Sequence, residues 1–252
     1  MKVVILAGGM GKRLSEETIF KPKPMVEIGG KPILWHIMKI YSAFGFNDFI
    51  ICLGYKGYII KEYFANYFLH LSDVTIDLKE NRIEYHLSDC EPWRVTLVDT
   101  GILTETGGRV KRVAKYIGAQ TFMLTYGDCI GNVNIKELLN FHRTRGRLLT
   151  FTAVKFPCEY GILELSETEE VEITDPPQKK ENWICGGFFV VEPEVLERLE
   201  GDDTDWDSIL AELIKEQKVA VYKHYGFWYG VNTFKDVEYL EKLWNKGKFL
   251  WL

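Results

Sequence analysis

The sequence has little that cysteine or histidine chemistry could organise. Its five cysteines are odd in number and scattered, with no C-x-x-C pair, at Cys52, Cys90, Cys129, Cys158 and Cys185. This spacing supports neither a disulfide framework nor a zinc site. The five histidines are also dispersed. His36 and His142 fall in apolar helical patterns, so we expect them to be packed rather than catalytic.

Long apolar runs and an excess of positive charge are missing too. Each apolar stretch has the length of a strand, well below the roughly 20 residues of a membrane span. The 31 Lys and Arg residues against 36 Asp and Glu give a net charge of -5, so no basic stripe is available for nucleic acid. Met1 leads directly into the first expected strand, unlike a signal peptide. We expect a cytoplasmic protein that binds neither nucleic acid nor membrane.

The pattern that is present favours one α/β domain over residues 1–252. At 252 residues and 46% hydrophobic composition, the chain can bury one large core. Strand-like runs alternate with helical ones, which predicts a Rossmann-like, mostly parallel mixed sheet flanked by helices. The strands are expected at 3–6, 48–53, 96–99, 121–126, 148–154, 183–191 and 219–222, and the helices at 32–44, 58–68, 107–116, 135–145, 192–199, 206–216 and 233–243. An aromatic helical tail, 233–252, is expected to pack back on the domain.

The first twenty-five residues carry the strongest functional signal. The apolar run 3–6 ends in Ala7-Gly8-Gly9-Met10-Gly11, Lys12 and Arg13 follow, and Lys21-Pro22-Lys23-Pro24 comes soon after. A buried strand that feeds a glycine-rich loop brings backbone N–H groups close to a ligand. Four cationic side chains around the loop indicate a polyanion, for which a nucleoside triphosphate is the best fit. Ligands of such sheets bind at the carboxyl ends of the strands, where this loop lies.

Competing interpretations of the loop fit the letters less well. A dinucleotide fingerprint needs G-x-G-x-x-G, but Leu14 takes the third glycine position. A P-loop needs Ser or Thr after Gly-Lys, where Arg13 stands. A glycine turn that binds no ligand remains an alternative, although such a turn has no need of paired cations.

Two further segments suggest binding chemistry. Asp128 follows an apolar strand and should reach the same sheet edge as the glycine loop, where a carboxylate suits Mg²⁺. The alternative is that Asp128 caps the next turn. The segment Thr106-Gly107-Gly108-Arg109 predicts a helix start at which small residues let a base approach and N–H groups meet anions. Its alternative is a capped surface helix with a solvated basic face.

These motifs resemble a known family. The pattern L-A-G-G-x-G-x-R-L…K-P-K-P-M is similar to the signature of sugar-phosphate nucleotidyltransferases. Further segments resemble its glucose-1-phosphate cytidylyltransferase (CDP-glucose pyrophosphorylase) branch, and the similarity spans essentially the whole chain. These segments are 27–38, 54–58, 60–70, 72–75 and 98–101.

The resemblance implies a reaction and the residues for it. CTP and a sugar 1-phosphate, with α-D-glucose 1-phosphate the expected acceptor, would give CDP-glucose and pyrophosphate. Arg13, Lys23 and Asp128 would be catalytic, with Asp128 on Mg²⁺, and the fold would form a homohexamer. The nucleotide would be bound by Leu6, Ala7, Gly8, Gly9, Gly11, Lys12, Thr106, Gly107, Gly108 and Arg109.

The chain departs from the family pattern beyond residue 170. A second metal carboxylate is expected in G-F-W-x-x-x-D-T, but Asn232 stands there. E-K-P becomes Asp175-Pro176-Pro177, N-G-G becomes Cys185-Gly186-Gly187, and a tryptophan–acid segment is shortened at 206–210. The acceptor half, 150–232, would then use Tyr160, Gly161, Asp175, Lys179, Cys185 and Gly186. Two hypotheses follow: CMP transfer to a different phosphorylated acceptor, or an impaired paralogue that binds CTP or a CDP-sugar.

Overall fold

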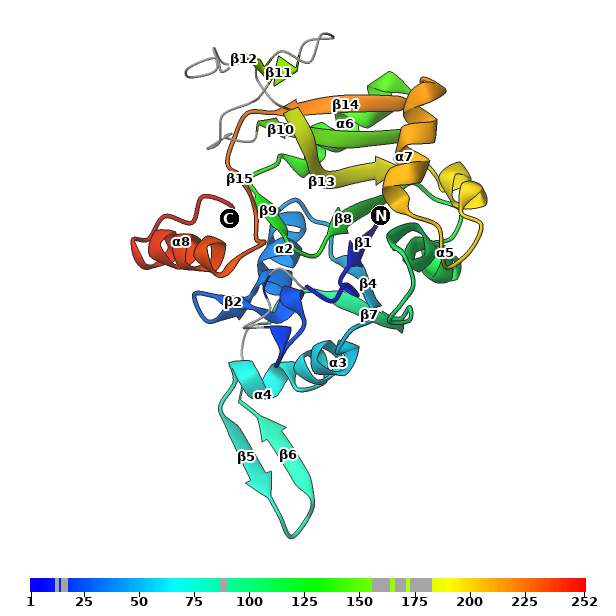
Figure 1. Cartoon of the computed structure of the whole chain (residues 1–252). Helices are drawn as coiled ribbons and strands as arrows, with labels where there is room; N and C mark the ends of the chain where they lie inside the picture. Colours follow the sequence, from blue (N-terminus) through cyan, green and yellow to red (C-terminus); the bar gives the residue numbers. More distant parts are fainter. Residues whose placement is uncertain (12–13, 15–17, 87–89, 156–163, 166–170, 173–182) are drawn as a thin grey trace.

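The core of the molecule is one mixed sheet of seven strands (Figure 1). The computed structural model describes residues 1–11, 14, 18–86, 90–155, 164–165, 171–172 and 183–252. β13 is antiparallel to both of its neighbours, whereas the other strand pairs are parallel. The mostly parallel mixed sheet is therefore confirmed. Its order is β14 (Val219–His224), β10 (Leu149–Lys155), β13 (Trp183–Val191), β8 (Phe122–Tyr126), β1 (Lys2–Leu6), β4 (Asp48–Leu53) and β7 (Arg94–Asp99).

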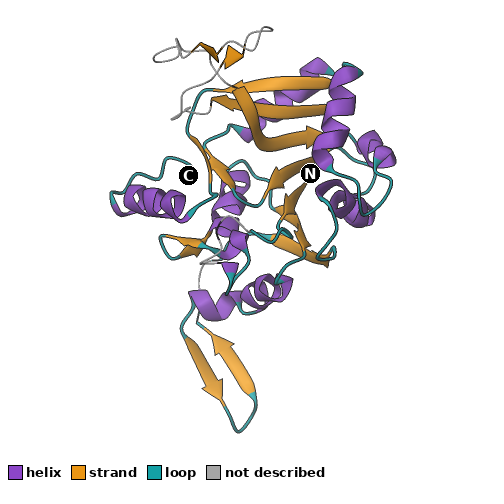
Figure 2. Cartoon of the chain, in the orientation of Figure 1, coloured by secondary structure: helices purple, strands orange, loops and turns teal. Residues whose placement is uncertain are grey.

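Helices cover both faces of the sheet (Figure 2). Successive side chains of a strand point to opposite faces, and β1 shows this directly. Val3 and Ile5 join the core under α2 (Ile33–Ser42), α6 (Ile135–Arg145) and α8 (Phe234–Asn245). Val4 and Leu6 join the core under α5 (Thr106–Ile117), α7 (Trp206–Lys215) and the 3₁₀ helix η3 (Pro193–Arg198). The central strands are therefore buried on both sides.

Short elements surround this frame. They are the 3₁₀ helix η2 (Lys23–Met25), the pair β2 (Glu27–Ile28) and β3 (Lys31–Pro32), α3 (Gly57–Ala65), α4 (Tyr67–Leu71), the pair β9 (Cys129–Gly131) and β15 (Trp228–Gly230), and the pair β11 (Glu164–Leu165) and β12 (Val171–Glu172). The helix expected over 58–68 is divided into α3 and α4, and that expected over 192–199 is the 3₁₀ helix η3.

A hairpin projects from the body below α4 (Figure 1). It is formed by β5 (Val74–Asp77) and β6 (Arg82–Tyr85), which pair antiparallel. Sequence analysis predicted no strand there. Ile76, Leu78 and Ile83 are 54%, 88% and 46% exposed, so this hairpin presents apolar side chains outward.

The aromatic tail packs back on the domain, as predicted. Trp251 is 1% exposed, and its Nε1 donates to Nδ1 of the buried His36 at 3.2 Å. His36 Nε2 lies 2.9 Å from Ile28 O. Burial lowers the pKa of His36 to about 4. His142 is also buried and lies 2.8 Å from Thr150 Oγ1, so both histidines are packed as expected.

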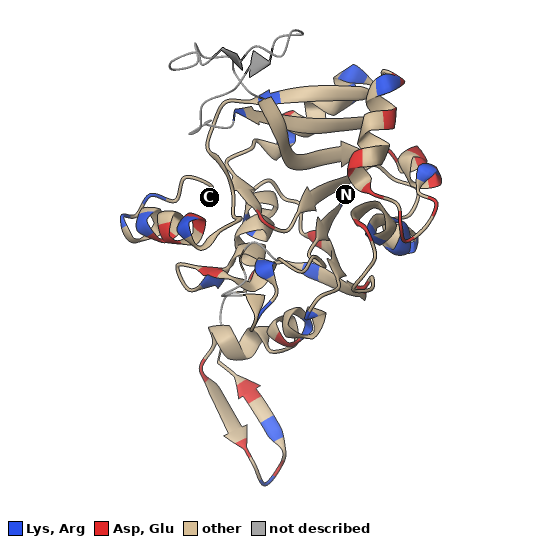
Figure 3. Cartoon of the chain, in the orientation of Figure 1, with Lys and Arg blue, Asp and Glu red and all other residues tan. Residues whose placement is uncertain are grey.

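Charges of both signs are interspersed on the outer helices (Figure 3). In α8, for example, basic and acidic residues follow each other along the helix. Within the described part of the chain, no helix has the length and apolar character needed to cross a membrane.

Candidate active site

A cleft of about 580 Å³ opens at the carboxyl ends of β1 and β8. One wall is the glycine loop, another is the segment 102–106, and the third follows β8. Gly11 has φ +61, a left-handed conformation that favours glycine. Of the residues predicted to bind the nucleotide or to catalyse, the cleft is lined by Leu6, Ala7, Gly8, Gly9, Gly11, Lys23, Thr106, Arg109 and Asp128. Lys12 and Arg13 lie outside the described residues.

Two residues that line this cleft, Lys23 and Asp128, meet Asn232. Lys23 Nζ lies 2.5 Å from Asp128 Oδ2 and donates to Asn232 Oδ1 at 3.1 Å. The Lys23 side chain is 10% exposed and that of Asp128 is 29% exposed. Solvent screening is therefore weak on the lysine side, and the charged hydrogen bond is correspondingly strong.

The strand pair β9–β15 explains why Asn232 reaches Asp128. Cys129 on β9 pairs with Gly230 on β15, and Val231 N donates to Asp128 O at 2.8 Å. Asn232 N donates to Asp236 Oδ2 at 2.8 Å. Asp236 also completes a capping box with Thr233 at the start of α8. The Asn232 backbone is thus held from both sides.

These groups fit a divalent cation. Asp128 and Asn232 direct one carboxylate and one amide oxygen toward a single cationic atom, and hard oxygens are the ligands that Mg²⁺ prefers. Among the described residues, no group of three His, Cys, Asp or Glu side chains gathers in metal-binding fashion. A cation here would therefore need phosphate oxygens and water to complete its shell.

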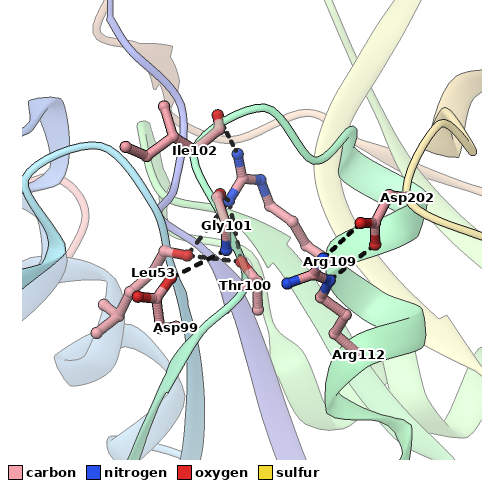
Figure 4. Close-up of polar contacts among 8 residues, drawn as sticks. All are labelled: Leu53, Asp99, Thr100, Gly101, Ile102, Arg109, Arg112 and Asp202. Atoms are coloured by element: carbon pink, nitrogen blue, oxygen red, sulfur yellow. Dashed lines mark hydrogen bonds and ion pairs between the residues drawn. The ribbon is translucent and has the colours of Figure 1, made fainter.

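The Arg109 side chain is buried and donates hydrogen bonds to neighbouring segments of the chain (Figure 4). Its Nη1 donates to Thr100 Oγ1 at 2.9 Å, to Gly101 O at 2.7 Å and to Leu53 O at 3.3 Å. Its Nη2 donates to Ile102 O at 3.3 Å. Burial lowers the pKa of Arg109 below its ordinary value. The guanidinium therefore joins Leu53 to the segment 100–102. A Cβ on Gly8 would lie 2.1 Å from Nη1, so the glycine loop packs closely on the same guanidinium.

This structural role of Arg109 was not predicted. Sequence analysis placed Arg109 near the nucleotide, and it does line the cleft. Its Nη1 and Nη2 atoms, however, donate to oxygens of the protein itself. One turn on, Arg112 pairs with Asp202 and ties α5 to the loop before α7 (Figure 4).

The pair Gly107 and Gly108 faces the same loop. A Cβ on Gly107 would lie 2.8 Å from Thr204 O, and one on Gly108 would lie 2.5 Å from Asp202 O. Gly108 N donates to Thr204 O at 2.9 Å. Close packing of α5 on the loop is therefore a reason for Gly-Gly that sequence analysis missed. Neither glycine is part of the cleft lining, and their predicted contact with a base stays a prediction.

On the acceptor side, Cys185 and Gly186 lie on β13 beside the end of β8. Phe188 pairs with Thr125 of β8. Gly186 O accepts from Trp228 Nε1 at 2.8 Å, and burial raises the pKa of Cys185 to about 11, so its thiol stays protonated. Tyr160, Gly161, Asp175 and Lys179 lie outside the described residues.

Tyr126 forms the cleft wall on this side, a role that sequence analysis did not assign. Its hydroxyl donates to Asp207 Oδ1 at 3.0 Å, and burial raises its pKa above the ordinary value. Gly187 has φ +76, and a Cβ on it would lie 2.6 Å from Tyr126 Cδ2. Tyr126, Gly187 and Asp207 therefore depend on each other for position.

The chain is similar to known proteins along almost its whole length. The nucleotidyl transferase family model matches residues 2–246. Glucose-1-phosphate cytidylyltransferase from Salmonella typhi is 52% identical over 100% of this chain and 98% of its own length. A probable glucose-1-phosphate cytidylyltransferase from Bacillus subtilis is 42% identical over 100% and 99%.

Solved structures show the same fold. A UDP-glucose pyrophosphorylase complexed with UDP-glucose has a TM-score of 0.69 at 18% identity, and the match covers 98% of each chain. HddC from Yersinia pseudotuberculosis has a TM-score of 0.66 at 23% identity over 96% of this chain and 99% of that one. The chain therefore belongs to the nucleotidyl transferase family and, within it, to the glucose-1-phosphate cytidylyltransferases.

Proposed function

We propose that this protein transfers CMP from CTP to α-D-glucose 1-phosphate, giving CDP-glucose and pyrophosphate. The full-length identity to glucose-1-phosphate cytidylyltransferases supports both substrates. The observation that carries the proposal is the convergence of Asn232 with Lys23 and Asp128, two residues that line a cleft together with the glycine loop. A cationic side chain, hard oxygen ligands and backbone N–H groups are what a triphosphate requires.

The proposed reaction needs no covalent intermediate with the protein. An oxygen of the acceptor phosphate attacks the α-phosphorus of CTP and forms a new P–O bond. The bond from the α-phosphorus to the bridging oxygen breaks, and pyrophosphate leaves in line with its electron pair. The protein contributes positioning and charge neutralisation. We assign neutralisation to Lys23 and, from the sequence pattern, to Arg13.

Asp128 and Asn232 would hold a divalent ion, which we propose to be Mg²⁺. When bound, the ion would neutralise charge on the phosphates and act as a Lewis acid. Arg109 would hold the glycine loop in its binding conformation before the substrates arrive, so that the loop need not rearrange during the reaction. We propose that Tyr126, held by Asp207, lines the opposite wall and contacts the acceptor.

Organisation and location follow as part of the proposal. We propose a single domain over 1–252, with the acceptor half at 150–232 and the tail at 233–252. We further propose a homohexamer, supported by the outward apolar side chains of the β5–β6 hairpin. The substrates are small phosphates and the sequence carries a net charge of -5, which supports a cytoplasmic enzyme without a nucleic-acid or membrane partner.

Measurement of pyrophosphate release tests the proposed function. The purified protein would be given Mg²⁺, each of CTP, UTP, dTTP and GTP, and each of several sugar 1-phosphates and other phosphomonoesters. We expect release with CTP and glucose 1-phosphate above every other pair. Release with CTP and another acceptor would favour the different-acceptor hypothesis, and tight CTP binding without any release would favour the impaired paralogue.

A further inference from the structure

The two oxygens suited to a divalent ion already face a cation that belongs to the chain. Lys23 Nζ lies within hydrogen-bond distance of both Asp128 Oδ2 and Asn232 Oδ1. An ion that used the same two oxygens would occupy the position of the ammonium. Lys23 and the ion therefore cannot both keep these contacts.

The long lysine side chain can give way to an ion. The backbone of Asn232 is held by the β9–β15 pair and by Asp236, and Asp128 follows directly from β8 through Gly127. The Lys23 backbone is in η2 between two prolines, and the residue is 8% exposed. Its four-carbon stem, however, has rotatable bonds that can redirect the ammonium.

Charge balance decides which cation is favoured. Asp128 contributes one negative charge, Lys23 one positive charge, and Asn232 none. The paired site is neutral, so a divalent ion gains little by replacing the ammonium, which would be left partly buried without a partner. The carboxylate that the family resemblance implies at position 232 would leave one uncompensated negative charge. Asn232 thus removes the charge that would attract an ion to the protein alone.

The phosphates of a nucleotide change this balance. They offer oxygens to the ion and a new anionic partner to the Lys23 ammonium. We infer that Lys23 and the divalent ion compete for Asp128 Oδ2 and Asn232 Oδ1, and that Asn232 makes ion binding conditional on the nucleotide. This inference rests on the proposed function, because it requires a phosphate-bearing ligand in the cleft.

Binding of Mn²⁺, followed by the electron paramagnetic resonance of the free ion, tests the inference without turnover. The full-length protein is titrated without nucleotide and with CTP, and no acceptor is present. Without CTP, Asn232→Asp should bind Mn²⁺ about tenfold more tightly than wild type, because a neutral ligand becomes charged. Lys23→Met should also bind Mn²⁺ more tightly without CTP, because the competing cation is gone. With CTP, the advantage of Asn232→Asp should shrink.

Two matched substitutions control for charge alone. Asn134→Asp adds a carboxylate at the N-cap of α6, where Asp also caps. Lys39→Met removes an ammonium 4.0 Å from Glu91, outside the cleft. Both should bind Mn²⁺ as wild type does. Wild-type affinity in either Asn232→Asp or a folded Lys23→Met would overturn the inference.

The proposed function can fail separately. Thermal unfolding shows whether each variant is folded. If Lys23→Met is not folded, Asn232→Asp, which keeps Lys23, decides the test. Pyrophosphate release by the wild type with CTP and glucose 1-phosphate is measured in parallel. If the variants show the expected Mn²⁺ affinities but the wild type releases no pyrophosphate, the competition between Lys23 and the ion is supported and the proposed function is wrong.

Discussion

Two of the three walls of the cleft, the glycine loop and the wall that follows β8, are built by different means. At the glycine loop, backbone defines the surface, because a side chain at Gly8 would clash with the buried Arg109 guanidinium. At the wall that follows β8, a side chain defines the surface, because Tyr126 lines the cleft and its hydroxyl donates to Asp207. We propose that the first wall binds the nucleotide and the second the acceptor.

The two walls should also differ in how they tolerate substitution. A wall of backbone tolerates few substitutions, since almost any side chain at Gly8 would displace Arg109 and the segments it holds. A wall of side chains can change its ligand one residue at a time. The departures at Asp175, Cys185 and Asn232 all come from the later half of the chain. Asn232 is the one described residue among them that contacts the nucleotide side, through Lys23.

The strongest test compares the carboxylate proposed to bind the cation with the carboxylate that holds the Tyr126 hydroxyl. Asp128→Asn should lower kcat/KM about a thousandfold, equivalent to about 4 kcal/mol, because the proposed cation loses its only charged protein ligand. Asp207→Asn should cost less than about tenfold, because it disturbs a single hydrogen bond to Tyr126. Both are measured by pyrophosphate release, with thermal unfolding to confirm that the variants are folded. Equal losses would show that Asp128 has no greater role in the reaction than Asp207.

A pair of neighbouring glycines tests the backbone wall itself. Gly8→Ala should lower the free energy of unfolding by about 2–3 kcal/mol, since its Cβ would lie 2.1 Å from Arg109 Nη1. Gly9→Ala is the matched control, because no atom lies within 4 Å of a Cβ there, and it should stay within about 0.5 kcal/mol of wild type. Urea unfolding measures both. A Gly8→Ala protein as stable as Gly9→Ala would mean that the loop does not rest on Arg109.

Much of the frame could be predicted because its local signals are strong. The predicted bounds of β4, β13 and α6 are those of the structure. For α6 the reason is visible: Asn134 caps its first turn and Gly146 ends it with φ 55. The β5–β6 hairpin gave no comparable signal, because its side chains are exposed and therefore need not alternate.

The site was predictable where chemistry is local and not where it depends on distant pairing. The glycine loop could be recognised from a few consecutive residues. The place of Asn232, in contrast, is set by the three-residue strands β9 and β15, which are too short to show a period. Arg109 illustrates a second limit. A cation at a helix start looks the same in sequence whether it faces phosphate or the protein's own carbonyl groups.

Acid should lower the free energy of unfolding through two buried histidines, His36 and His224. The pKa of His36 is lowered to about 4 by burial, and that of His224 on β14 is lowered for the same reason. The unfolded chain takes up the His36 proton near pH 6.5, whereas the folded protein does so only near pH 4. The His36 contribution is therefore complete above pH 6.5 and is lost by about 1.4 kcal/mol per pH unit below it.

Urea unfolding at pH 7.5, 6 and 5 measures this slope. His36→Asn should make it shallower, and His224→Asn should do so too, because burial also lowers the pKa of His224. An unchanged slope in His36→Asn would show that His36 is not the group responsible.

The smallest expected effect probes the side-chain wall. Tyr126→Phe removes a hydroxyl that donates to Asp207 at 3.0 Å but keeps a ring held by Gly187 and packed edge-on against Phe189. We expect the KM for glucose 1-phosphate to rise about fivefold, equivalent to about 1 kcal/mol, with the KM for CTP unchanged. Tyr222→Phe is the control, since its hydroxyl also donates to a carboxylate at 3.0 Å, that of Glu137, outside the cleft lining. A rise in the KM for CTP instead would place Tyr126 with the nucleotide, and the two walls would then share one ligand.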